Sequence, residues 1–171
     1  METQEQTVLA LDVSTTSTGY ALYVGDKLTK YGYVKPTGKD WLTRVRKMAD
    51  KVTELSRDFN IDTVVIEDTF FLKNIKTVKK LCLAQGILLG QLPNAELIQV
   101  FPNTWKKHFG LGKGKATRSE QKQTSISVAE TMFLIEYGIN DDEADAILMG
   151  RYVLEKWKGV NDGFKRPILF H

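Results

Sequence analysis

Four acidic residues have the types and positions that a metal site for phosphodiester chemistry requires. Asp12 and Glu67 each close a short apolar run, TVLALD and DTVVIE, and functional groups collect where the strands of an α/β sheet end. Asp142 and Asp145 are three residues apart at the predicted start of a helix, so they share one of its faces. We therefore predict that the four carboxylates converge, although each alone could be a strand end, a lysine partner or a helix-start charge.

The chemistry of such a cluster follows from its charge. Close carboxylates repel by roughly 4 kcal/mol per pair at an effective dielectric near 20, so four of them need a counter-cation. Hard oxygen ligands favour Mg²⁺ or Mn²⁺ over zinc. Two such ions about 3.5–4 Å apart can activate a water molecule and stabilise a leaving oxygen, which suits hydrolysis of a phosphodiester. The pattern predicts two metals per site, with catalytic and metal-binding roles for Asp12, Glu67, Asp142 and Asp145.

Basic residues are concentrated between Trp105 and Lys122, against a single acid, Glu120. Such a cluster suits contact with phosphates, and the alternative interpretation is a solvated charged loop. The whole chain has 24 Lys and Arg against 21 Asp and Glu, so its net charge of +3 does not by itself indicate nucleic acid. The predicted DNA-contacting residues of this stretch are Lys106, Lys107, Lys113, Lys115, Arg118 and Lys122.

Two adjacent aromatic residues, Phe70 and Phe71, follow the second acid in a predicted loop. Neighbouring residues of an extended segment point to opposite sides, so we expect one ring inside and one exposed. An exposed ring can stack on an unpaired base, which contributes roughly 1–3 kcal/mol. The alternative is that both rings pack inward.

A stripe of small residues recurs every four positions, at Cys82, Gly86 and Gly90. On a helix this spacing makes a flat face that another helix can approach closely. The residues alone leave two interpretations open: packing of this helix on the sheet of the same chain, or self-association.

The elements that must position these residues follow from the apolar pattern. Strands are predicted at 7–12, 18–24, 28–34, 62–67 and 96–101. Helices are predicted at 40–60 and 74–92, from the capping box at 117–120 onward, and at 140–158. A Gly/Lys loop at 108–116 directly precedes the helix that opens with the capping box. An antiparallel start followed by alternating helices and strands implies a mixed sheet with helices on its faces.

Length and composition bound the class of protein. The 171 residues suit a single domain, with 158–171 as an irregular tail, and no apolar run is long enough to span a membrane. Cys82 is the only cysteine, so an intrachain disulfide and thiolate zinc sites are excluded. The polar N-terminus is not a secretory signal, and we expect a reducing compartment, the cytoplasm of a bacterial cell.

Three motifs resemble those of the RuvC-type Holliday junction resolvases, bacterial or phage-encoded members of the RNase H-like (retroviral integrase) superfamily. LALDVSTTSTGYAL is similar to the family's first strand and hairpin, VVIEDTFFLKN to its second motif, and DDEADAILMG to its closing D-x-x-D-A motif. The similarity extends from about residue 7 to residue 153. In one departure, Val13-Ser14 follows the first acid where the family usually has Pro-Gly.

The resemblance implies a fold, a reaction and partners. The fold would be an RNase H-like mixed five-stranded sheet, three antiparallel strands followed by parallel strands, with helices on both faces. The protein would be a homodimer, paired through the helix with the small-residue stripe, that binds a four-way DNA junction. It would make paired symmetric nicks with Mg²⁺ or Mn²⁺, leaving 5′-phosphate and 3′-hydroxyl ends. Phe70 matches the aromatic that stacks near the crossover, and Lys73 of the same motif is a further expected DNA contact.

Other functions were weighed against this one. The segment DVSTTST is similar to the phosphate-binding turn of sugar-kinase or actin-like ATPases, but those proteins need two lobes and a glycine where Ser14 stands. A DNA-branch binding protein that has lost cleavage would not be expected to retain all four acids. A different RNase H-like nuclease, acting on ribosomal RNA precursors or RNA–DNA hybrids, is the third alternative.

Overall fold

The fold is built around one mixed β-sheet, seen in a computed structural model that describes residues 5–69, 74–111, 116–136 and 138–158. Its strand order is β3-β2-β1-β4-β5. β1 pairs antiparallel with β2, and β2 with β3, while β1, β4 and β5 are parallel. The strands are β1 (Thr7–Val13), β2 (Thr18–Val24), β3 (Lys27–Val34), β4 (Thr63–Glu67) and β5 (Glu96–Val100). The predicted mixed sheet is therefore confirmed.

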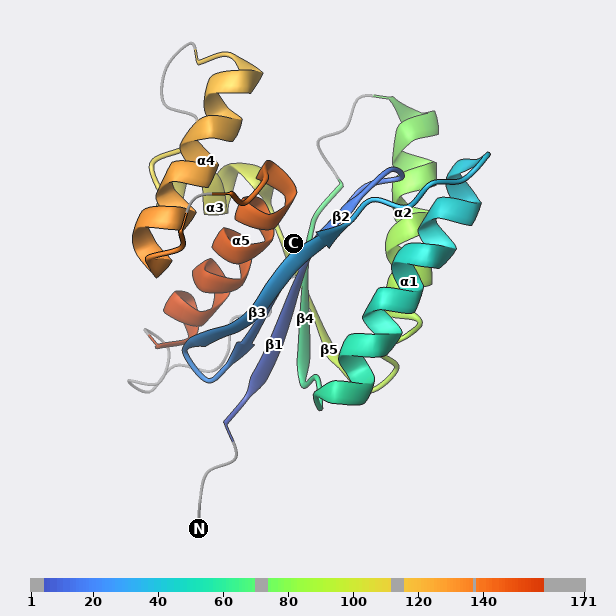
Figure 1. The fold of residues 1–171 in the computed structure, drawn as a ribbon, viewed down its shortest axis with the longest axis horizontal. Helices are drawn as coiled ribbons and strands as arrows, with labels where there is room; N and C mark the ends of the chain where they lie inside the picture. Colours follow the sequence, from blue (N-terminus) through green and yellow to red (C-terminus); the bar gives the residue numbers. More distant parts are fainter. Residues whose placement is uncertain (1–4, 70–73, 112–115, 137, 159–171) are drawn as a thin grey trace.

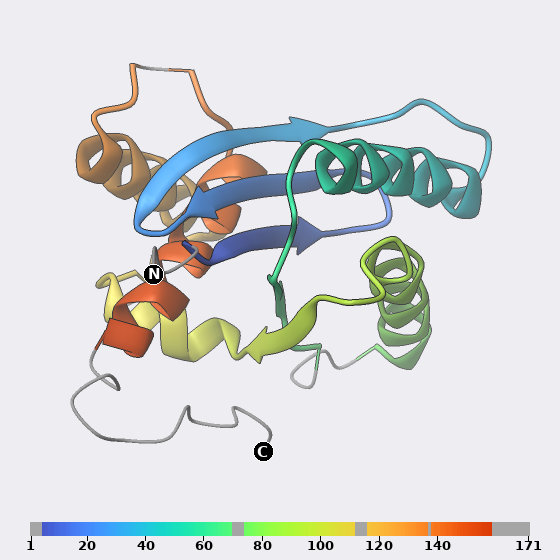
Figure 2. The same cartoon turned by 90° about the horizontal axis from the view of Figure 1, so that it is seen from below.

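Helices cover both faces of the sheet. The described helices are α1 (Trp41–Asp58), α2 (Ile75–Leu89), α3 (Pro102–His108), α4 (Arg118–Phe133) and α5 (Asp141–Lys158). Figures 1 and 2 show α1 and α2 together on one face, and α3, α4 and α5 on the other. Two buried apolar clusters, one on each face, fill the space between these layers. No helix in the described ranges is long and apolar enough to cross a membrane.

Alternation along β1 decides which face each side chain occupies. Leu9 and Leu11 belong to the cluster under α1 and α2, whereas Val8 and Ala10 belong to the cluster under α5. Because successive side chains of a strand point to opposite faces, Asp12 lies on the side of α5. The same alternation holds in β4. Val65 packs under α5, so Glu67, two residues later, lies on the same face of the sheet.

Side-chain caps begin the helices where the sequence predicts them. Asp40 accepts a hydrogen bond from the backbone N–H of Thr43 at the start of α1. Asn74 caps α2, and Thr117 forms a complete capping box with Glu120 at the start of α4. At the start of α5, the side chain of Asn140 accepts a hydrogen bond from the backbone N–H of Glu143. The carboxylate of Glu143 accepts one in return from the backbone N–H of Asn140. These predictions are confirmed, and each cap satisfies N–H groups that a helix start leaves without partners.

One helix, α3, is absent from the sequence-based prediction. Pro102 was interpreted only as the end of a strand, but it occupies the first turn of this helix, where the missing N–H costs nothing. Seven residues are too few to show a helical period. Trp105 of α3 is completely buried in the α5-side cluster, whereas Trp41 is half-buried at the edge of the other cluster.

Candidate active site

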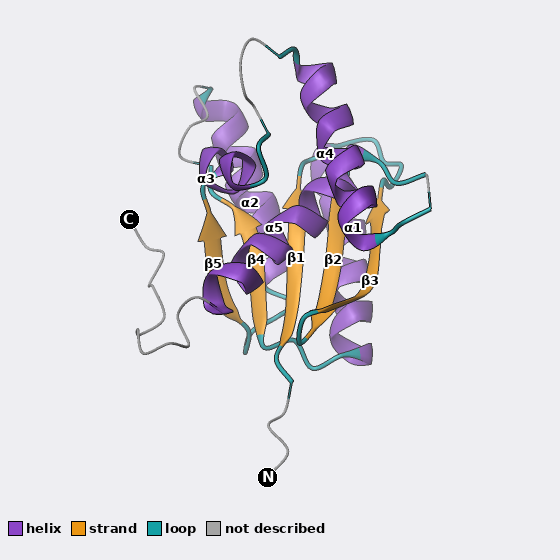
Figure 3. Ribbon diagram, turned by 90° about the vertical axis from the view of Figure 1, so that its left-hand side faces the viewer, coloured by secondary structure: helices purple, strands orange, loops and turns teal. Residues whose placement is uncertain are grey.

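The four predicted acids line one cavity of about 640 Å³. It lies at the carboxyl end of the central strands; Figure 3 shows the arrowheads of β1, β4 and β5 at the same edge of the sheet. The β1–β2 turn, the end of β3, α3, and one face each of α4 and α5 complete its walls. The lining residues are Asp12, Ser14, Thr16, Ser17, Lys35, Glu67, Lys106, Leu111, Arg118, Gln121, Lys122, Ser125, Asp141, Asp142 and Asp145.

Strand pairing and helix packing bring the acids together from distant parts of the chain. Leu11 of β1 pairs with Ile66 of β4, so the acids that follow them, Asp12 and Glu67, end neighbouring parallel strands. Asp12 also pairs with Gly19 of β2. The start of α5 packs directly on this glycine, where an added β-carbon would overlap the backbone carbonyl of residue 142. This close approach sets the height of α5 above the sheet.

Glu67 is held by two consecutive residues of α3. The indole Nε1 of Trp105 donates to its Oε1 at 3.0 Å, and the Nζ of Lys106 lies 3.8 Å from the same oxygen. The side-chain amide of Gln85, on α2, donates to the backbone carbonyl of Glu67 at 2.8 Å. Contacts from both sides of the sheet thus fix the end of β4.

The two acids of α5 have different surroundings. Ser17 donates its hydroxyl to Oδ2 of Asp142 at 2.5 Å. Oδ2 of Asp145 lies 3.9 Å from the Nζ of Lys106, and Ser125 of α4 hydrogen-bonds to the same carboxylate. The other oxygen, Oδ1 of Asp145, is buried and has no hydrogen-bond partner. A buried carboxylate oxygen without a partner is costly, and a bound cation would satisfy it.

Ser14 organises the turn in which the resembled family usually has Pro-Gly. Its Oγ accepts from the backbone N–H groups of Thr16 and Ser17, and it donates to the carbonyl of Ser17 at 2.8 Å. The turn therefore draws its rigidity from a side chain. It also orients the serine that contacts Asp142.

Burial disfavours the charged forms of Asp12, Glu67 and Asp145. Burial raises the pKa of Asp12 well above its ordinary value, and the negative charges of the other three acids raise it further. Burial also raises the pKa of Glu67, while Lys106 and the hydrogen bond from Trp105 act in the opposite direction. Burial raises the pKa of Asp145 to about 6, although the positive charge of Lys106 acts to lower it. One ammonium group is thus the main positive charge among four acids.

The residues present fit a divalent cation, although they do not enclose one in this conformation. Within the described ranges, no three His, Cys, Asp or Glu side chains are closed into a ready-made ligand set. Lys106 lies beside Glu67 and Asp145 and supplies positive charge there. The oxygen-only donor set and the unsatisfied Oδ1 of Asp145 match the preferences of Mg²⁺ and Mn²⁺.

The predicted basic residues fall into three groups. Lys106, Arg118 and Lys122 line the cavity, and Lys122 forms an ion pair with Asp141. Lys107 is exposed and is not part of the cavity lining. The remaining predicted DNA contacts, Phe70, Lys73, Lys113 and Lys115, lie outside the described residues.

The small-residue stripe faces away from the sheet. Cys82, Gly86 and Gly90 are exposed, and a β-carbon added at Gly86 would meet nothing within 4 Å. The buried residues of α2 are Ala84, Gln85 and Leu88, which lie on its other side. Packing of the stripe on the sheet of the same chain, one of the two interpretations left open, is therefore wrong.

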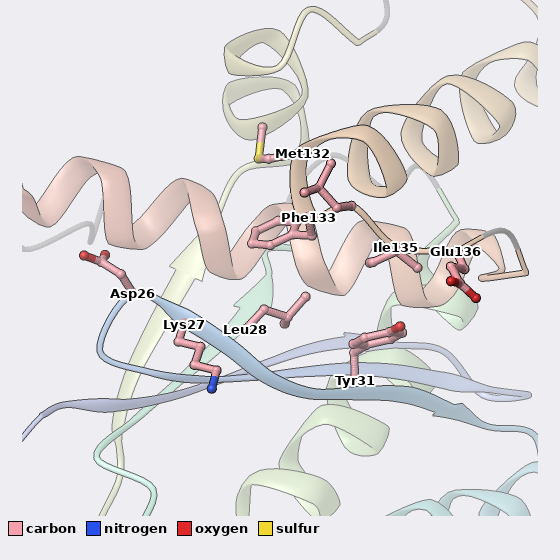
Figure 4. Close-up of a pocket in the computed structure, with 9 residues that line it drawn as sticks. Asp26, Lys27, Leu28, Tyr31, Met132, Phe133, Ile135 and Glu136 are labelled. Atoms are coloured by element: carbon pink, nitrogen blue, oxygen red, sulfur yellow. The ribbon is translucent and has the colours of Figure 1, made fainter.

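A second cavity, of about 650 Å³, lies between the start of β3 and the end of α4. Figure 4 shows Leu28 and Tyr31 rising from β3 toward Phe133 and Ile135. Its rim carries Leu134, which is 89% exposed and has a left-handed backbone conformation. Its charged lining residues are Asp26, Lys27 and Glu136, none of which belongs to the four-acid cluster.

Comparison with known proteins places the chain in a family. A family model described as "Lactococcus phage M3 protein" matches residues 5–155. The crossover junction endodeoxyribonuclease RuvC of Dictyoglomus turgidum is 31% identical over 158 residues, covering 89% of this chain and 98% of that protein. The chain belongs to the RuvC family. It also belongs to the phage protein family that the model describes. The similarity to RuvC confirms the resemblance that the three motifs indicated.

Solved structures agree with this family in fold. Thermus thermophilus RuvC in complex with a Holliday junction substrate superposes with a TM-score of 0.70 at 18% identity, covering 90% of this chain and 96% of that one. The yeast mitochondrial Holliday junction resolvase gives a TM-score of 0.59 at 11% identity, covering 93% and 82%. At these identities the likeness concerns the fold alone, and it confirms the predicted RNase H-like architecture of this RuvC-family chain.

Several residues of the site escaped the sequence-based analysis. Trp105, Ser17 and Ser125 contact the acids, and Lys35 lines the cavity. None of them belongs to a spacing pattern, because each reaches the site from a separate element. Pro102 occupies the first turn of the helix that carries Trp105, but a proline at this position fits the end of a strand equally well, so it did not identify the helix.

Proposed function

We propose that the protein is a metal-dependent endodeoxyribonuclease that resolves Holliday junctions or related branched DNA. The observation that carries the proposal is the meeting of Asp12, Glu67, Asp142 and Asp145 in one cavity of a RuvC-family chain. The relatives that match are crossover junction endodeoxyribonucleases, and one structural neighbour was solved with a Holliday junction. Cleavage would hydrolyse one phosphodiester per active site and leave 5′-phosphate and 3′-hydroxyl ends.

The four acids would hold Mg²⁺ or Mn²⁺, with two ions per active site. Bound there, the ions would supply an activated water and charge stabilisation for the leaving oxygen. The chain's own groups prepare this site: Trp105 and Lys106 orient Glu67, and Ser17 orients Asp142. These charged groups are partly buried, and charge–charge contacts are stronger there than in open solvent.

Basic residues at the mouth of the cavity would bind the sugar–phosphate backbone. Arg118 and Lys122 lie on one face of α4, together with Gln121 and Ser125, at the spacing of successive helical turns. Contacts of this kind position a nucleic acid without reading its sequence. Phe70 and Lys73 would contribute from the segment after β4, stacking on a base and binding a phosphate.

A homodimer would present two such sites to one junction. The exposed stripe of Cys82, Gly86 and Gly90 on α2 is the surface through which we expect the protomers to meet. A two-fold dimer places equivalent active sites on a substrate with pseudo-two-fold symmetry, so two symmetric strands can be cut.

A cleavage panel tests the proposal. Four-way junction, fork, flap, linear duplex and RNA–DNA hybrid would be incubated with Mg²⁺, with Mn²⁺ and with EDTA, using Glu67→Gln as the inactive control. We expect paired nicks in the junction, only with metal and only in the wild type. Cleavage of the hybrid in preference to every branched DNA would favour the RNA-directed alternative. Tight junction binding without any cleavage would favour a branch-binding protein.

A further inference from the structure

Two cations at the cavity have no ion-pair partner among the residues that the structure describes. Lys35, directly after β3, and Arg118, the first residue of α4, both line the cavity and are exposed. Neither forms an ion pair or a side-chain hydrogen bond with another residue in the described parts of the chain. The other two lysines, Lys106 and Lys122, are each paired with acids of the cavity. Among the described cations that line the cavity, Lys35 and Arg118 are thus the ones left for a negatively charged ligand.

The register of the sheet gives the position of Lys35 relative to the acids. Asp12 pairs with Gly19, and Gly19 pairs with Tyr33, so one row crosses β1, β2 and β3 at the same level. Neighbouring strands are about 4.8 Å apart, which places β3 roughly 10 Å from β1. Successive phosphates of one DNA strand rise about 3.4 Å along the helix axis and also turn about it, so they are farther apart than this rise. A span of roughly 10 Å therefore reaches from one phosphate only to its near neighbours on the same strand. Lys35, two residues beyond Tyr33, therefore stands within reach of phosphates that flank one held at the acids.

We propose that Lys35 is a substrate-positioning residue that binds a backbone phosphate of the cleaved strand, close to the scissile phosphate. Arg118 would hold the same strand from the helical wall of the cavity. The inference rests on the proposed nuclease function. It extends the DNA-binding surface of the protein to the end of β3, outside the basic stretch between Trp105 and Lys122. A lysine reads charge and not base identity, so Lys35 would strengthen binding equally for junctions of any sequence.

The other end of β3 offers a matched control. Lys27 is also exposed and forms no ion pair with a described residue. It lines the second cavity, close to Asp26 (Figure 4), and it is not among the residues that line the cavity of the four acids. Lys27→Ala thus removes the same charge from the same strand, about 27 Å from Lys35.

The experiment compares Lys35→Ala, Lys35→Arg and Lys27→Ala in the Glu67→Gln background, which keeps the junction intact. Dissociation constants would be measured for a four-way junction over a range of salt concentrations. We expect Lys35→Ala to weaken binding about tenfold and to lower the slope of log Kd against log salt by about 0.9, the value for one phosphate contact. Lys35→Arg and Lys27→Ala should retain the parent slope. In otherwise wild-type protein, Lys35→Ala should raise KM and leave kcat within about twofold.

A chemical probe locates the phosphate. Junctions would each carry one uncharged methylphosphonate, at successive positions within four nucleotides of the cleaved bond. At one position the parent protein should lose as much affinity as Lys35→Ala does, and the variant should lose nothing further. An unchanged salt slope in Lys35→Ala, or the same slope change in Lys27→Ala, would overturn the role of Lys35 while wild-type cleavage still stands. A wild-type protein that neither binds nor cuts branched DNA would instead overturn the proposed function.

Discussion

Trp105 donates its indole N–H to Oε1 of Glu67 at 3.0 Å, from a helix that begins two residues after the end of the neighbouring strand β5. The ring is completely buried, so the donor has one orientation available. The next residue, Lys106, adds its charge to the same oxygen. The short helix α3, which no sequence pattern predicted, therefore determines the orientation of the Glu67 side chain.

Trp105→Phe should weaken both metal binding and the fold. The variant keeps an aromatic ring in the core but leaves Glu67 without its indole donor, and outer contacts of this kind are typically worth 10–100-fold in metal affinity or activity. The loss of a hydrogen bond to a charged group should lower the free energy of unfolding by about 1.5–3 kcal/mol. Mn²⁺ titration followed by calorimetry measures the first effect, and urea unfolding without metal the second. Unchanged Mn²⁺ affinity would show that the indole only fills space.

Gly19→Ala should abolish cleavage. The added β-carbon would overlap the carbonyl of Asp142, so α5 must move off the sheet and carry both of its acids away from Asp12. Gly86→Ala, on the open face of α2, adds the same methyl group where nothing lies within 4 Å. A junction-cleavage assay with both variants, checked by circular dichroism, makes the comparison. Full activity in Gly19→Ala would contradict the close approach of α5.

Glu67→Gln should stop cleavage, retain junction binding and leave the metal-free fold at least as stable. The substitution removes a buried negative charge from a cluster in which burial and repulsion already raise the pKa values. Gel-shift binding, cleavage and thermal melting in EDTA test the three statements. Marked thermal destabilisation in EDTA would mean that the contacts from Trp105 and Lys106 outweigh the repulsion.

The stability of the metal-free protein should depend on pH through Asp145. Its folded pKa of about 6 lies above the ordinary value of 3.8, so the folded state binds this proton more tightly than the unfolded state. The contribution to stability is present below pH 4 and is lost as the pH rises toward 6, by an amount on the order of 1–3 kcal/mol. Urea unfolding in EDTA at pH 4.5 and 7.5 should show this loss in the wild type and less of it in Asp145→Asn. An identical pH dependence in the two proteins would contradict the assignment.

Gly86→Arg should convert a dimer into a monomer without unfolding it. The new side chain would project from the exposed stripe, where the monomer has room for it but a closely packed partner helix would not. Analytical ultracentrifugation of the wild type and the variant measures the change. Thr29→Arg, on the exposed side of the edge strand β3, is the control for added charge. A variant that sediments like a wild-type dimer would exclude α2 from the interface.

The sequence by itself determined the elements and the identity of the acids. Apolar runs marked the five strands, and the capping box at Thr117 and Glu120 marked the start of α4, because these signals act over a few neighbouring residues. The position of Asp12 and Glu67 at strand ends was visible for the same reason. Local signals could not reveal α3, which is too short to show a period and takes its stability from a buried Trp105.

Only the tertiary structure decided how the acids are surrounded. Asp142 faces Ser17 while its neighbour Asp141 pairs with Lys122, a choice made by the rotation of α5 on Gly19. The tertiary structure also placed Lys106 beside the acids, and it left Lys35 at the cavity without an ion pair to any described residue. These relationships join residues tens of positions apart, and the strength of a charge–charge contact depends on distance and burial. Both quantities exist only once the sheet and its two helical layers have packed.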